Sequence, residues 1–334
     1  MGEGEGDEAA TIADSIVRHT ETAVLPPARA WRLRLSSCPP AHLSDRPIPM
    51  SVADEPELRS VTCAHPGGLH RMAYWQWGEA DNPSVVVCVH GLTRSGRDFD
   101  ALARRLATRH RVVCPDIIGR GASERVAQPM LYQVPQYVSD CVTLVARLDV
   151  PSVAWVGTSM GGLIGMVLAS LDGAPVSRLL LNDVGPVLSV AGLSRIRDYV
   201  GADPVFASFE EGEAAVRRLA ADFGPLTDAQ WRVLTRHTVV QRDGGWRLHY
   251  DPRIAEPFRA MPVEAPDLWP IYDRIACPTW IVRGARSDLL SEAVADEMTQ
   301  RGPRAHRVDV AGVGHAPTFL PDDQIAIVEA FLDA

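Results

Sequence analysis

The chain has 334 residues, a net charge of −9 and a hydrophobic content of 46%, which is the composition of an ordinary globular protein. This length can hold one large α/β domain, with or without an insertion. The negative charge argues against a nucleic-acid partner, because affinity for phosphate backbones depends on clustered cations. Every basic residue is an arginine, so a phosphate-loop lysine, a pyridoxal Schiff base and a lysine general base are excluded.

The cysteines are scattered along the chain and include no C-x-x-C pair. This pattern is typical of small apolar side chains in a reducing compartment, and we expect neither a disulfide framework nor a metal site. No apolar run follows a basic start at the N-terminus, so we expect no secretory signal and a cytoplasmic location. We also expect no cofactor.

Residues 1–56 differ in composition from the rest of the chain. They open with the acidic, glycine-rich run MGEGEGDE and then carry seven prolines. Such composition favours disorder over a packed element. We therefore predict a dispensable N-terminal tail, with Met50 as an alternative initiator.

From residue 57 onward the hydrophobic pattern becomes regular. Segments 59–63 and 72–77 indicate a hairpin, and apolar strands at 84–89, 111–114, 153–156 and 177–181 alternate with helical patterns at 99–108, 136–148 and 161–171. The alternation resumes with strands at 278–283 and 306–310 and helices at 291–300 and 322–332. Short connections between alternating elements predict an α/β fold with a mostly parallel, doubly wound sheet, built from residues 57–186 and 273–334.

Residues 187–272 interrupt this alternation. They contain helical patterns at 194–199, 211–223 and 228–236, a hairpin signal at 243–245 and several aromatic residues. Because the strand pattern returns afterwards, we predict an inserted, mainly helical lid and not a separate domain.

The stretch 153–171 reads as a short apolar strand, a sharp turn and an apolar helix. The turn, Gly157-Thr-Ser-Met-Gly161, matches G-x-S-x-G, in which a serine at the tip of a strained strand-to-helix turn is a nucleophile. Residues 151–171 contain no charged side chain, but four glycines interrupt them and no basic residue flanks them. We therefore predict a nucleophile, Ser159, and no membrane span.

A serine nucleophile needs a histidine that accepts its proton and a carboxylate that orients the histidine. His315 follows the strand at 306–310, and Asp288 follows the strand at 278–283, so both lie at carboxyl ends of strands, where ligands bind in an open parallel sheet. Asp183 also follows a strand and is the alternative to Asp288. His90 is expected to brace the loop that it begins.

An oxyanion intermediate would be held by two backbone amides. One is that of Met160, directly after the serine, and the other is that of Leu92, in the loop after the strand at 84–89.

Five motifs appear in a fixed order: Val89-His-Gly-Leu, Asp116-Ile-Ile-Gly-Arg-Gly-Ala-Ser, Gly157-Thr-Ser-Met-Gly-Gly, Arg283-Gly-Ala-Arg-Ser-Asp and Gly312-Val-Gly-His-Ala-Pro. Together they resemble the α/β-hydrolase superfamily, and in particular its lidded bacterial carboxylesterases, enol-lactone hydrolases and carbon–carbon-bond hydrolases. The resemblance covers residues 58–334. It implies the chain order Ser159, Asp288, His315, and the serine distinguishes the chain from dehalogenases and epoxide hydrolases, which have an aspartate there.

We therefore predict a serine hydrolase of a small-molecule ester, thioester or lactone, with Thr93, Arg94, Trp231 and Trp269 as candidate substrate-binding residues. The first alternative is hydrolysis of a carbon–carbon bond in a vinylogous diketone by the same triad, with Arg94, Arg97 or Arg195 holding a substrate carboxylate. The second alternative is a non-catalytic ligand receptor on the same fold.

Overall fold

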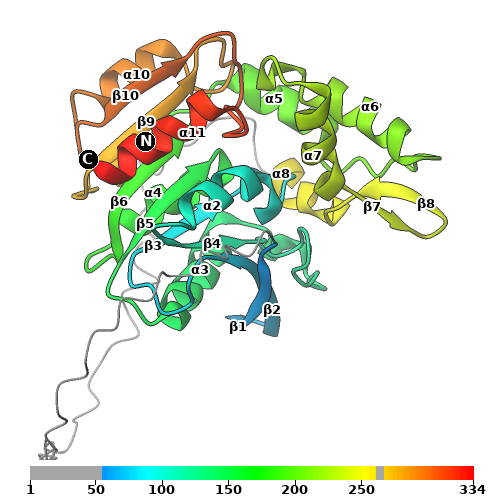
Figure 1. Cartoon of the computed structure of the whole chain (residues 1–334), viewed down its shortest axis with the longest axis horizontal. Helices are drawn as coiled ribbons and strands as arrows, with labels where there is room; N and C mark the ends of the chain where they lie inside the picture. The colour runs from blue at the N-terminus through cyan, green and yellow to red at the C-terminus, as the bar shows by residue number, and fades with distance from the viewer. Residues whose placement is uncertain (1–54, 261–266) are drawn as a thin grey trace, which may run out of the picture. The chain divides into compact units, whose positions relative to one another are not determined.

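A mostly parallel sheet of eight strands, in the order β1-β2-β4-β3-β5-β6-β9-β10, organises the computed structural model (Figure 1). The structure describes residues 55–260 and 267–334. Almost all of the predicted tail, up to residue 54, lies outside the described residues. The predicted α/β class is confirmed.

The first two strands form the predicted hairpin. β1 (Glu57–His65) pairs antiparallel with β2 (Gly68–Trp77), and β2 pairs antiparallel with β4. All other neighbouring pairs are parallel, and they place the carboxyl ends of the central strands at one edge of the sheet. These strands are β3 (Val85–Val89), β4 (Arg111–Pro115), β5 (Val153–Thr158), β6 (Val176–Asn182), β9 (Thr279–Gly284) and β10 (His306–Val310).

Helices cover both faces of the sheet. Side chains of α2 (Asp100–Leu106) and α11 (Asp322–Asp333) pack in one hydrophobic core, and those of α3 (Val134–Leu148), α4 (Met160–Ala169) and α10 (Glu292–Met298) pack in the other. Alternate residues of β3 enter opposite cores, since Val85, Val87 and Val89 face one core and Val86 and Cys88 face the other. This double burial explains why the strand reads as a continuous apolar run.

Between β6 and β9 the described chain forms an insertion, which comprises α5 (Val190–Tyr199), α6 (Phe209–Leu219), α7 (Asp228–Thr238), β7 (Val239–Arg242), β8 (Gly245–Leu248), α8 (Ala255–Ala260) and α9 (Trp269–Tyr272). Its elements α5 to α8, including the β7–β8 hairpin, lie to one side of the sheet (Figure 1), while α9 packs against α4. The first three helices begin where the side chains of Ser189, Ser208 and Thr227 accept hydrogen bonds from helical amides.

Short 3-10 helices lie between these elements: η1 (Gly96–Phe99), η2 (Pro129–Leu131), η3 (Ala221–Phe223) and η4 (Pro252–Ile254).

The apolar stretch 151–171 is divided between β5 and α4. Within residues 55–260 and 267–334, no helix has both the length and the apolar character that crossing a membrane requires.

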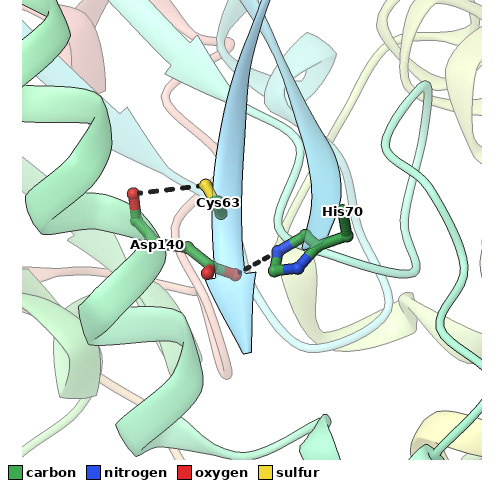
Figure 2. A group of neighbouring side chains, drawn as sticks. All are labelled: Cys63, His70 and Asp140. Atoms are coloured by element: carbon green, nitrogen blue, oxygen red, sulfur yellow. Dashed lines mark hydrogen bonds and ion pairs between the residues drawn. The ribbon is translucent and has the colours of Figure 1, made fainter. Parts of the chain in front are cut away.

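A buried polar cluster joins the hairpin to α3 (Figure 2). Nε2 of His70, on β2, lies 2.9 Å from Oδ2 of Asp140 on α3, and the other carboxylate oxygen accepts a 2.7 Å bond from Gln136. The thiol of Cys63, on β1, lies 3.9 Å from the backbone oxygen of Asp140. All three residues of the cluster are buried, and their contacts connect the hairpin to the helix.

The same three side chains offer a thiol, an imidazole and a carboxylate within 4.8 Å of one another, a donor set that zinc accepts. Two observations argue against a metal bound by all three side chains. Nε2 of His70 is already hydrogen-bonded to the Asp140 carboxylate, so these two groups satisfy each other. Burial raises the pKa of the Cys63 thiol to about 12, which disfavours the thiolate that a metal needs. We therefore interpret the cluster as a set of hydrogen bonds that anchors the β1–β2 hairpin to α3.

Replacing Asp140 with alanine is expected to lower the free energy of unfolding by about 1–3 kcal/mol, because His70 then remains buried without its hydrogen-bond partner. The double variant His70→Leu/Asp140→Leu should be the more stable of the two, since it leaves no buried polar atom unpaired. Urea unfolding of both variants measures this difference. Equal stability of Asp140→Ala and the wild type would contradict the anchor.

Candidate active site

Ser159 occupies the tip of the turn between β5 and α4. Its backbone has φ 52° and ψ −114°, a conformation that costs a non-glycine residue about 1–3 kcal/mol. The flanking glycines are required by close approach. A Cβ on Gly157 would lie 2.3 Å from the Gly161 carbonyl oxygen, and one on Gly161 would lie 2.0 Å from that of Val89. The strained turn leaves the Ser159 side chain at the surface of a cavity.

His315, in the loop after β10, connects the serine to a carboxylate. Its Nε2 lies 3.0 Å from Oγ of Ser159, and its Nδ1 lies 2.7 Å from Oδ2 of Asp183. Because an ionised carboxylate can only accept, Nδ1 carries the proton and Nε2 is left as the acceptor for the serine hydroxyl. The three groups therefore form one hydrogen-bonded chain.

Asp183 directly follows β6 and is completely buried. Besides His315, its carboxylate accepts a 2.9 Å bond from the Gly284 amide and a 2.6 Å bond from the Ser287 hydroxyl. Both donors come from the end of β9 and the loop that follows it, so two neighbouring strands hold this carboxylate in place.

Asp288, the residue expected to orient His315, has a different partner. Its carboxylate receives two bonds from Arg195 on α5, 2.5 Å from Nε and 2.9 Å from Nη2. The hydrogen bonds from Arg195 lower the pKa of Asp288 below its usual value. The Asp288 carboxylate is therefore taken up by the insertion, whereas the buried Asp183 carboxylate bonds to His315.

The two predicted oxyanion amides lie beside the serine. A Cβ on Gly91 would lie 3.7 Å from Cβ of Ser159, which brings the loop after β3 against the turn. Within the described part of the chain, the Leu92 amide donates to no other group. Met160 is the first residue of α4, where a helix leaves its amides unpaired.

His90 braces this loop, as the sequence predicts. It is fully buried, its Nε2 accepts a 2.9 Å bond from the Ile117 amide, and its Nδ1 donates across 2.7 Å to the Gly91 carbonyl oxygen. Burial lowers the pKa of His90 to about 3, so the ring is neutral at physiological pH. The acceptor carbonyl belongs to the same peptide group as the Leu92 amide, so the bond fixes the direction of that amide.

A cavity of about 100 Å³ adjoins Ser159 and His315. Its walls come from the loop after β3, including Thr93 and Arg94, and from the insertion. The insertion contributes Arg195 and Tyr199 of α5, several residues of α6 and the turn after it, and Tyr250. The sequence contained no motif for these aromatic wall residues, because their positions depend on how the insertion packs on the core.

Trp231 and Trp269 do not line this cavity, in contrast to the sequence-based expectation. Both side chains are buried in the core. The Trp231 ring lies 5.8 Å from the guanidinium carbon of Arg217, and the Trp269 ring packs edge-on against Tyr272 at 5.5 Å. Tryptophan in an insertion with its own helices contributes apolar area to that packing, which its sequence position alone does not distinguish from ligand binding.

Two of the three candidate carboxylate-binding arginines line the cavity. Arg94 and Arg195 do so, each with two of its nitrogen atoms bonded to an aspartate, Asp98 and Asp288 respectively. Arg97 is bonded to Asp100 and lies over the ring of Trp75 at 4.6 Å.

The model of the alpha/beta hydrolase family matches residues 86–328, which include all three members of the hydrogen-bonded chain. The solved structures agree with this fold. The chain is similar to an alpha/beta hydrolase from Novosphingobium aromaticivorans (37% identity, TM-score 0.76, covering 84% of this chain and 98% of that one). It is also similar to a putative hydrolase from Rickettsia typhi (28% identity, TM-score 0.78, 83% and 99%).

Among curated proteins, the 3-hydroxybutyrate-oligomer hydrolase of Cupriavidus necator is 52% identical over 285 residues, which cover 83% of this chain and 97% of that protein. Esterase YbfF of Escherichia coli is 27% identical over 271 residues, or 75% and 94%. By name, the first relative is a hydrolase of 3-hydroxybutyrate oligomers and the second is an esterase. The resemblance drawn from the five motifs is confirmed. The chain is a hydrolase and belongs to the alpha/beta hydrolase family.

Proposed function

We propose that the protein hydrolyses carboxylic esters through an acyl-enzyme on Ser159. The observation that carries this proposal is the hydrogen-bonded chain from Asp183 through His315 to the serine hydroxyl. In the first step His315 takes the serine proton while Oγ attacks the ester carbonyl, and the Leu92 and Met160 amides hold the oxyanion. His315 then protonates the departing alcohol and, in the second step, activates a water that releases the acid.

The substrate that the site supports best is a short linear ester of a hydroxy acid. Such an oligomer contains an ester bond between units and ends in a free carboxylate, and the relative that is 52% identical acts, by its name, on oligomers of 3-hydroxybutyrate. Arg195 lines the same cavity as Ser159, and Asp288 occupies only its Nε and Nη2 atoms. We propose that Nη1, to which Asp288 does not bond, binds the terminal carboxylate of the oligomer.

We also propose that residues 187–272 act as a lid. This segment supplies Arg195, Tyr199 and Phe223 to the cavity wall, opposite the serine turn and the loop after β3. Its helices therefore help to exclude water from the ester during acylation.

Replacing Ser159 with alanine should lower kcat for p-nitrophenyl butyrate by about 10⁶ and leave the fold intact, because the nucleophile is lost. Equal activity of the variant and the wild type would disprove the mechanism.

Two further measurements test the alternative functions, carbon–carbon-bond hydrolysis and ligand binding without catalysis. Bleaching of a dienol-dienone substrate would favour carbon–carbon hydrolysis, and ligand binding without fluorophosphonate labelling would favour a receptor.

The two aspartates should respond differently to substitution. Asp183→Asn is expected to lower kcat by about 10⁴, because the amide no longer holds His315 in the productive tautomer. Asp288→Asn should lower kcat for an uncharged ester by less than about tenfold, since it changes only a partly exposed ion pair. Steady-state kinetics with p-nitrophenyl butyrate compares the two variants. The opposite order of effects would assign the catalytic acid to Asp288.

Substitution of Arg195 should affect only substrates that carry a carboxylate. For Arg195→Leu we expect KM for the free-acid dimer of 3-hydroxybutyrate to rise about 10- to 100-fold, the range for losing a hydrogen bond to a charged group. KM for the methyl ester of the same dimer should remain near the wild-type value. The double variant Arg195→Leu/Asp288→Leu removes any repulsion by an unpaired Asp288. Arg236→Gln, an exposed arginine of α7, is the charge control. Equal losses for both dimers would contradict carboxylate binding.

A further inference from the structure

Arg120 lies at the centre of a tight turn between β4 and α3 and is 1% exposed. The glycines on either side have φ values of 81° and 51°, which favour glycine. The turn is also attached to the insertion: the Asp251 amide donates to the Gly119 carbonyl at 2.7 Å, and the Gly121 amide donates to the His249 carbonyl at 3.1 Å. The guanidinium is therefore held in a fixed, dry position.

This guanidinium contacts both residues whose amides are proposed to hold the oxyanion. Its Nε donates to the Leu92 carbonyl oxygen at 2.9 Å, and its Nη2 lies 3.6 Å from Sδ of Met160. Nη1 donates to the Ile118 carbonyl oxygen at 2.7 Å and to the Tyr137 hydroxyl at 2.9 Å. One side chain thus connects the loop after β3 to the start of α4.

No acid among the described residues forms a hydrogen bond or ion pair with Arg120. Across residues 55–260 and 267–334, its hydrogen bonds all go to neutral acceptors, and the nearest aromatic support is the Tyr137 ring at 5.1 Å. Buried charges are usually paired with an opposite charge. Burial without an acid does not by itself indicate function, because Arg111 is also buried and donates to Gln76 and to the Leu148 carbonyl. What distinguishes Arg120 is its place behind Leu92 and Met160.

We propose that Arg120 is a positioning residue of the oxyanion hole, which fixes Leu92 and Met160 and places an unneutralised positive charge behind their amides. The proposal rests on the serine mechanism above. A substrate ester is neutral at its carbonyl oxygen, whereas the tetrahedral intermediate carries a full negative charge there. A fixed cation in a dry environment therefore stabilises the intermediate more than the bound substrate. We therefore expect the charge of Arg120 to raise kcat and to leave KM unchanged.

The test compares Arg120→Lys, which keeps the charge, with Arg120→Gln, which keeps a donor but loses the charge. Arg111→Gln is the matched control, because it removes a second buried arginine from the opposite end of β4. Each protein is assayed with p-nitrophenyl butyrate and with phenylboronic acid. Boron accepts the Ser159 oxygen while His315 takes the serine proton, so the adduct is tetrahedral and anionic and no group leaves.

We expect Arg120→Gln to lower kcat about 10- to 100-fold with KM unchanged, and to weaken boronic acid binding by a similar factor. Arg120→Lys should recover part of both losses, and Arg111→Gln should behave as the wild type in both assays. If Arg120→Gln does not fold, as judged by its thermal transition, Arg120→Met serves as the neutral variant.

Three results would overturn the proposal: a folded neutral variant with wild-type kcat, a loss confined to KM, or an Arg120→Lys variant no better than Arg120→Gln. None of these results would contradict the role of Ser159 as nucleophile, because the Ser159→Ala variant tests that role separately. Conversely, an active Ser159→Ala protein would remove the serine mechanism itself, and the two failures can be told apart.

Discussion

The backbone of Ser159 is the constraint on which the site depends. A left-handed φ at a non-glycine residue persists only where its surroundings hold it, and here the Ser159 amide donates to the Asn182 carbonyl oxygen at 3.0 Å. The buried Asn182 amide group donates to the Thr158 hydroxyl at 2.9 Å and to the Pro317 carbonyl at 2.8 Å. One asparagine at the end of β6 thereby connects the serine turn to the loop that carries His315.

Most of the fold could be predicted from hydrophobic pattern alone. β3 and β5 are buried on both faces, so each appears in the sequence as a short run of apolar residues, and the strand predicted at 153–156 is the first part of β5, which continues through Gly157 to Thr158. The first and last residues of the helices and strands were harder to predict from the sequence. α5 begins at Val190, four residues before the segment that the pattern suggested, because its start is determined by the Ser189 side chain bonding to the Gly192 amide.

The site was predictable where one residue has a local signature. Ser159 and His315 each lie in a short motif, and the structure brings them together. The choice between Asp183 and Asp288 could not be made this way, because each follows a strand and the sequence does not state which carboxylate reaches the histidine. The side-chain contacts decide it, since His315 bonds to Asp183 and Arg195 bonds to Asp288. The contacts of Arg120 were hidden for a similar reason, since Leu92, Met160 and Tyr137 come from three separate segments.

The turn at Gly119–Gly121 has a consequence for how the insertion can move. Its two backbone hydrogen bonds to His249 and Asp251 continue the core into the strand-like segment after β8, and the Tyr132 hydroxyl donates to the Asp251 carboxylate at 2.7 Å. Residues 249–251 are therefore mechanically part of the hydrolase core, although they belong to the insertion in sequence. If the proposed lid opens, this attachment would stay in place, and the parts of the insertion left to move would be α5 and α6, which line the cavity.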